Sequence, residues 1–171
     1  MCRVAGTDLT ELSKATRCGD TRRSRIEQGA SMTLEPIDPL AWVKRNQARF
    51  FRGGQIDVIW LLAYVMSDVL ELGRGECRIV QRDGWWFVTS DVDWLAHDLP
   101  VRELFQRVVP APQHGEHSMR AEVLVNAFAA DVFAVSGGET IQIKGRAPDD
   151  ALIQSAVQGD APRGMMGFRL T

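Results

Sequence analysis

The residues of this chain best suited to act as acids and bases are histidines with aspartates close by in the sequence. His97 follows Asp91 and Asp93, and His117 lies in a loop-like stretch that also contains His114. Imidazole and carboxylate groups exchange protons near neutral pH, so His97, His117 and Asp93 are candidate catalytic residues for acid/base chemistry. The intervals between the histidines match no recognised zinc-ligand pattern, which argues against a histidine metal centre.

A second set of candidates lies along one predicted helix, residues 55–72. Its polar residues Asp57, Tyr64, Asp68 and Glu71 lie within about 60° of one another at 100° per residue, and so form one stripe. The stripe has two interpretations, a row of binding residues or the solvated face of a half-buried helix. In the first, the Asp68 carboxylate could hold a hard cation such as Mg²⁺.

Glycine, proline and hydrophobic periodicity divide the chain into the elements that must position these residues. The pattern predicts helices over 39–51, 55–72, 101–107 and 119–129, and strands over 77–81, 85–89, 131–136, 140–144 and 167–171. Asp38 is the expected N-cap of the first helix. Because the strands come as hairpins and the helices are separate from them, we expect an α/β (α+β) two-layer sandwich. Its sheet would be mixed and mostly antiparallel, with helices on one face.

The first 31 residues differ from the rest of the chain. They are rich in Thr, Ser, Arg and Gly with little apolar periodicity, which predicts a disordered or non-native N-terminal extension. Met32 then opens a sequence that reads like a normal start. The alternative is a basic arm that binds a partner through Arg17, Arg22, Arg23 and Arg25. Residues 32–171 are expected to form a single domain.

Composition narrows the classes of function. The formal net charge of −2 gives no basic field, which argues against direct DNA binding. No apolar run reaches the roughly 18 residues of a membrane span. Cys2, Cys18 and Cys77 are isolated and odd in number, so we expect neither a disulfide framework nor a zinc site, and a cytoplasmic location.

The order of elements and several local sequences resemble the GHKL (Bergerat-fold) ATPase domain of the type found in DNA gyrase and other type IIA topoisomerases. The segment KRNQARFFRGG resembles that family's entry segment, and DVIWLLAYVMSDVLE resembles its Glu-Val-Val-Asp-Asn-Ala-x-Asp-Glu helix. The segment QRDGWWFVTSD resembles the hairpin that delivers the adenine-binding Asp. GEHSMRAEVLVNAF resembles the Gly-rich lid and its following helix, and RGMMGFRLT resembles the closing strand. The resemblance covers about residues 39–171 and implies a pocket for ATP or ADP with Mg²⁺.

The family's catalytic helix has lost its general base in this chain. The register that preserves the polar stripe places Tyr64 at the family's Glu position and Asp68 at its Mg²⁺-binding Asn position. The rival register, shifted by one residue, gives Ala63 and Ser67. Neither register supplies a carboxylate at the Glu position, and a phenol with a pKa of about 10 is a poor base at neutral pH.

The other nucleotide motifs are degraded too. Asp91 matches the adenine-binding Asp, but Asp93 and Leu95 replace the two glycines that follow it in the family. In the lid, Gly115 and His117 match, whereas Glu116 brings a negative charge and Ser118 and Arg120 replace glycines. Arg120 could still contact a phosphate. In the closing strand, Met165 takes the place of the adenine-contacting Thr.

These losses predict a degenerate GHKL-like domain without ATP hydrolysis that serves as a ligand-binding or protein-interaction module. Weak binding of ATP or ADP with Mg²⁺ would use Asp68, Asp91, Tyr64 and Arg120, and otherwise no cofactor is expected. One alternative is an enzyme that reuses the former nucleotide pocket, with His97, His117 and Asp93 as acid/base groups. The other is a divergent ATPase whose partner supplies the missing groups. The sequence identifies neither the protein partner nor the small molecule.

Overall fold

The computed structural model describes residues 37–115, 118–157 and 161–170, all within one compact unit that spans Pro36–Thr171. The predicted extension at residues 1–31 lies outside the described residues. The helices are α1 (Pro39–Arg45), α2 (Val58–Asp68), α3 (Val101–Leu104), α4 (Glu122–Phe128) and α5 (Asp150–Ala156). The strands are β1 (Cys77–Arg82), β2 (Trp85–Ser90), β3 (Asp131–Ser136), β4 (Glu139–Lys144) and β5 (Gly164–Arg169). No helix in the described ranges is long and apolar enough to cross a bilayer.

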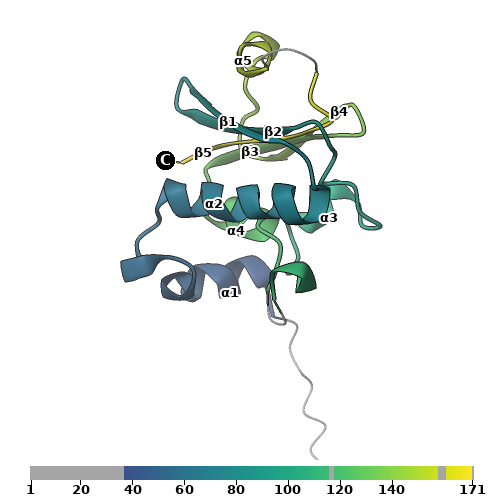
Figure 1. The fold of residues 1–171 in the computed structure, drawn as a ribbon. Helices are drawn as coiled ribbons and strands as arrows, with labels where there is room; N and C mark the ends of the chain where they lie inside the picture. Colours follow the sequence, from purple (N-terminus) through teal and green to yellow (C-terminus); the bar gives the residue numbers. More distant parts are fainter. Residues whose placement is uncertain (1–36, 116–117, 158–160, 171) are drawn as a thin grey trace, which may run out of the picture. The chain divides into compact units, whose positions relative to one another are not determined.

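The five strands form one antiparallel sheet in the order β1-β2-β5-β3-β4 (Figure 1). β1 with β2 and β3 with β4 are hairpins, as the sequence predicts, and β5 joins them by pairing with β2 and β3. The first turn places Asp83 and Gly84 at φ 48° and 78°, and two consecutive positive φ values are what a tight two-residue hairpin turn requires. The predicted α+β sandwich with an antiparallel sheet is confirmed.

Helices cover both faces of the sheet rather than one. On the first face, α2 and α4 pack against Val88, Val132 and Met166. On the second face, α5 packs against Phe87 and Met165 (Figure 1). Successive residues of a strand point to opposite faces of the sheet. Two adjacent apolar residues such as Phe87-Val88 therefore indicate that both faces are buried. As expected, α2 and α4 lie on one face of the sheet. The helix α5 packs on the opposite face, which the sequence analysis did not predict.

The helix boundaries follow local chemistry. Asp38 caps α1 by accepting a hydrogen bond from the Leu40 N–H at 3.0 Å, as predicted. The helix ends earlier than expected, and short 3₁₀ turns at Gln47–Arg49 (η1) and Arg52–Gly54 (η2) follow it. Asp57 caps α2 in the same way, through the Ile59 N–H at 2.8 Å. A π-helical turn, η3 (Val69–Gly73), then ends this helix.

The interpretation of the polar stripe on α2 as a solvated face is wrong for its central member. Asp57 and Glu71 are exposed, but Asp68 lies on the core side of the helix with Leu61 and Val65 and is only 2% exposed. Asp68 can be buried because α2 packs beside the beginning of α4, where its carboxylate finds hydrogen-bond partners. The outward side of α2 is instead largely apolar.

Candidate functional site

Asp68 is held in place by two hydrogen bonds, one to each carboxylate oxygen. The Ala121 N–H donates to Oδ2 at 2.6 Å, and Nε2 of His114 lies 2.8 Å from Oδ1. Ala121 directly precedes α4, and His114 belongs to the 3₁₀ turn η4 (Pro112–His114). These two contacts hold the end of α2 against η4 and the beginning of α4, and they fix the orientation of this carboxylate.

Arg120 and Glu122 form a buried ion pair next to Asp68. Arg120 is 5% exposed and Glu122 is fully buried. The guanidinium Nη2 lies 2.5 Å from Oε1 of Glu122, and Nε lies 3.1 Å and 3.2 Å from the two carboxylate oxygens. Nη2 also donates to the Trp94 carbonyl at 2.8 Å. This fork geometry directs the guanidinium towards the interior of the protein and away from any external phosphate.

Asp68, His114, Arg120 and Glu122 together make a buried charge cluster. Burial, assisted by the negative charge of Glu122, raises the pKa of Asp68 from 3.8 to about 7 against the opposing effects of the Ala121 N–H, Arg120 and His114. Burial alone would lower the pKa of Arg120, but the hydrogen bonds and charge of Glu122 outweigh it and raise that pKa. In this cluster the two carboxylates disfavour each other's charge, and Arg120 favours the charge of both.

Asp93 stabilises a neighbouring loop. Its Oδ2 accepts hydrogen bonds from the Ser136 hydroxyl at 2.7 Å and from the Gly137 N–H at 2.8 Å. Its Oδ1 accepts a hydrogen bond from the Leu95 N–H at 3.1 Å. Its charge also contributes to the raised pKa of Arg120. Asp93 therefore ties the β3–β4 turn to the segment after β2 and uses both of its oxygens to do so.

The indole of Trp94 packs against the beginning of β5, and the Cβ of Trp94 lies beside Gly73 at the end of η3. Trp94 is 2% exposed. A methyl group at Gly164 would come within 2.8 Å of the indole ring, and one at Gly73 would come within 3.1 Å of the Trp94 Cβ. Among the described residues, its Nε1 is the one buried side-chain nitrogen or oxygen without a hydrogen-bond partner. The ring therefore packs here through shape rather than through a polar contact.

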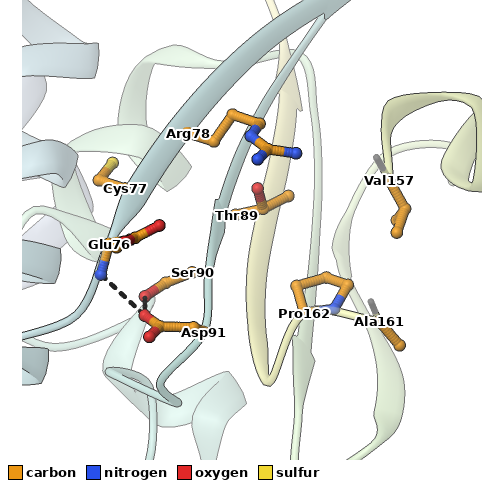
Figure 2. A pocket seen from close by; sticks show the side chains of 9 residues that line it. All are labelled: Glu76, Cys77, Arg78, Thr89, Ser90, Asp91, Val157, Ala161 and Pro162. Atoms are coloured by element: carbon orange, nitrogen blue, oxygen red, sulfur yellow. Dashed lines mark hydrogen bonds between the residues drawn. The ribbon is translucent and has the colours of Figure 1, made fainter. Parts of the chain in front are cut away.

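Asp91 lies on the other side of the sheet, beside a cavity of about 350 Å³ (Figure 2). Its Oδ1 accepts a hydrogen bond from the Glu76 N–H at 2.7 Å and lies 3.4 Å from the Ser90 hydroxyl oxygen. The cavity is lined by Glu76, Cys77, Arg78, Thr89, Ser90, Asp91, Val157, Ala161 and Pro162. Burial raises the pKa of the Cys77 thiol, so this sulfur is not an activated nucleophile. Since Thr89 shares the face of Phe87, the cavity opens on the α5 side, opposite the buried charge cluster.

The structure brings some predicted residues together and separates others. Asp68, Arg120 and Asp93 belong to one electrostatic network. Tyr64 does not join them, because its hydroxyl donates to the Phe50 carbonyl at 3.1 Å. His97 is exposed and its Nδ1 accepts a hydrogen bond from the Leu99 N–H at 2.9 Å.

Two of the three predicted acid/base residues, His97 and Asp93, lie in the described part of the chain, and the side chain of each accepts a hydrogen bond from the backbone N–H two residues later. No hydrogen bond or ion pair there joins His97 to Asp91 or Asp93. Glu116 and His117, the other predicted residues of the lid segment, lie outside the described residues.

Sequence reasoning missed Glu122 and the role of His114. Glu122 carried a usable signal. It lies two residues after Arg120 in the run AEVLVNAFAA, whose only other polar residue is Asn126, and a lone charge in such a run needs a buried partner. His114 gave no comparable signal, because only the folding of its loop brings it to Asp68.

Asp68 and Arg120, two of the residues expected to bind Mg²⁺ and nucleotide, are engaged with other groups of the protein. Each oxygen of Asp68 is already engaged in a hydrogen bond, so a cation would have to displace His114 or Ala121 from a carboxylate that is 2% exposed. No group of three or more His, Cys, Asp or Glu side chains among the described residues is arranged to hold a metal ion. The guanidinium of Arg120 is already committed to Glu122.

Replacing Asp68 with asparagine should flatten the pH dependence of stability. The pKa of Asp68 is raised in the folded state, so its contribution to stability is complete below about pH 4 and is lost as pH rises through about 7. The wild type should thus lose on the order of 2 kcal/mol between about pH 5 and pH 8.5 through this group, and Asp68→Asn should not. Urea denaturation across this pH range measures the difference.

The matched control is Asp57→Asn, which changes an exposed carboxylate at the start of the same helix and preserves a good N-cap. It should retain the wild-type pH profile. An Asp68→Asn profile parallel to the wild type would show that Asp68 is already ionised at about pH 5.

Comparisons with known proteins leave the chain without an assigned family. No family model, no curated protein and no solved structure matches it.

Proposed function

We propose that this protein is a degenerate GHKL-like domain of the gyrase type that no longer hydrolyses ATP and acts as a binding module for a protein or small molecule. The observation that carries this proposal is the burial and hydrogen bonding of Asp68. This residue takes the Mg²⁺-ligand position in the resemblance, yet it is buried and hydrogen-bonded at both oxygens.

The neighbouring groups support the same conclusion. Hydrolysis needs a base that orients and deprotonates water at the γ-phosphate. Tyr64, at the general-base position, hydrogen-bonds the Phe50 carbonyl instead. Arg120, the remaining candidate for phosphate binding, is neutralised by Glu122. In the family's Asp-x-Gly-x-Gly motif, a single residue lies between the two glycines. Trp94 takes the position of that residue, and its indole adds bulk there.

Titration with Mg–ATP, combined with a phosphate-release assay on the full chain, tests the loss of hydrolysis. We expect no phosphate release above the protein-free rate, and binding no tighter than about 1 mM. Turnover that disappears in Asp68→Ala but persists in Asp57→Ala would contradict the proposal, because it would show a working Mg²⁺-dependent site at Asp68.

A small-molecule enzyme is the second candidate, and the cavity beside Asp91 is the observation that favours it. Its walls carry hydroxyl, carboxylate and guanidinium groups from Thr89, Asp91 and Arg78, the mixture that orients a polar ligand. His97 and Asp93 do not line this cavity, whereas Asp91 does. This candidate therefore requires a site on the α5 face of the sheet rather than at the former nucleotide position.

A further inference from the structure

The outward side of α2 carries a row of exposed apolar side chains. Ile59, Trp60 and Met66 are 63%, 42% and 38% exposed, and Ile56 before the helix and Leu70 after it are 42% and 48% exposed. We call these five residues the α2 strip. The other large exposed hydrophobic residues in the described ranges are Ile37 before α1, Ile79 in β1 and Val108 after α3.

The α2 strip is nearly symmetric about Ala63. Trp60 and Met66 lie three residues to either side of Ala63, and Ile56 and Leu70 lie seven residues to either side. Within α2, Ile59, Trp60 and Met66 fall within about 60° of the direction in which Ala63 points, whereas Ile56 precedes the helix and Leu70 lies in the π turn that follows it. Ala63 itself is half-buried and small, so a second helix could approach closely at the centre of the strip.

Such symmetry suits a second copy of the same chain. Two α2 helices that pack antiparallel across a two-fold axis at Ala63 bring each end of the strip onto the opposite end of its copy. Trp60 then meets Met66, Ala63 meets Ala63, and Ile59, which has no apolar counterpart in the strip, meets Ser67. An unrelated partner would have no need for this internal symmetry.

The exposed area is consistent with a weak dimer. With side chains of roughly 150–250 Å² each, the measured exposures leave on the order of 400 Å² of apolar surface on one copy. That is within the range of the largest patches that monomers expose, and such patches are commonly functional. Two copies would bury at most roughly 800 Å² from the strip, which lies below the 1,200 Å² of stable specific interfaces and in the size class of weak, transient ones.

We propose that the α2 strip is the interface of a concentration-dependent homodimer with antiparallel α2 helices and a two-fold axis at Ala63. This inference does not depend on the proposed function. The dimer should have a dissociation constant of about 10–100 µM, since the interface is small and the strip itself is uncharged.

Sedimentation velocity on the full chain, from about 1 to about 300 µM, measures the association. Trp60→Glu places a charge in the middle of the strip and should weaken association at least about tenfold. Val108→Glu places the same charge on a similarly exposed residue outside the strip and should leave the association unchanged. A wild-type chain that stays monomeric throughout this range, or equal weakening by both variants, would overturn the proposal.

Disulfide trapping tests the axis. In a background with Cys2, Cys18 and Cys77 changed to serine, Ala63→Cys should form a disulfide-linked dimer under mild oxidation. Ser67→Cys lies on the same exposed side, but its two copies would be about 12 Å apart along the helix, too far for a disulfide. Parallel packing would trap both variants and packing through another surface would trap neither, and each of these results would overturn the antiparallel arrangement.

Discussion

Replacing Arg120 with methionine should destabilise the protein by about 3–5 kcal/mol. Methionine retains much of the volume but removes the guanidinium that neutralises Glu122, which is fully buried. It also removes a positive charge that lowers the pKa of Asp68. The free energy of unfolding from urea denaturation at about pH 7.5 measures the loss.

The chain supplies a matched control in Arg107, which forms an i,i+4 ion pair with Glu103 at 2.8 Å. Those two side chains are 60% and 36% exposed, so Arg107→Met should cost less than about 1 kcal/mol. The double variant Arg120→Met/Glu122→Leu should recover at least half of the lost stability, because it leaves no unpaired carboxylate from the pair. Equal effects of Arg120→Met and Arg107→Met would contradict a buried ion pair.

The features that the sequence predicts well are set by neighbouring residues. The turns at Asp83-Gly84 and Gly137-Gly138 need positive φ values, and both hairpins form where these residues stand. The caps of α1 and α2 likewise depend on one aspartate and the amide two residues later. Local chemistry of this kind can be predicted without knowing what packs against it.

The errors arise where a distant contact decides the outcome. Periodicity groups Asp68 with Asp57, Tyr64 and Glu71 on one side of the helix, but it cannot distinguish a solvated carboxylate from a buried one with partners. Those partners, His114 and Ala121, are 46 and 53 residues away. The same ambiguity hides the exposed apolar side of α2, since a run of hydrophobic residues predicts burial all round.

The α5 segment shows the complementary limit. Residues 146–162 mix polar and apolar residues, and the side chains of α5 that pack against the sheet are Leu152, Ile153 and Ala156. Three apolar positions are too few to give a periodic signal, whereas the strand pattern of Phe87-Val88 and Met165-Met166 does indicate that both faces are covered. The strand sequences therefore predict that both faces of the sheet are buried, whereas the sequence of α5 does not predict that this helix packs on the second face.

Replacing Trp94 with alanine should destabilise the protein by about 3–5 kcal/mol and leave a cavity between η3 and β5. The indole is 2% exposed and packs on Gly164 and beside Gly73, so few neighbouring side chains can move into the space. Free indole added in solution should bind the cavity and raise the melting temperature of the variant in a concentration-dependent way.

The control is Trp60→Ala, which removes a 42% exposed indole, creates no enclosed space and should show no response to added indole. The same pair of variants also tests the resemblance. If Trp94 fills the space that the adenine base takes in GHKL domains, then adenine as well as indole should stabilise Trp94→Ala, and neither should stabilise Trp60→Ala. If indole stabilises Trp94→Ala but adenine does not, the cavity results from side-chain packing alone. It would then give no support to the resemblance to a nucleotide-binding domain.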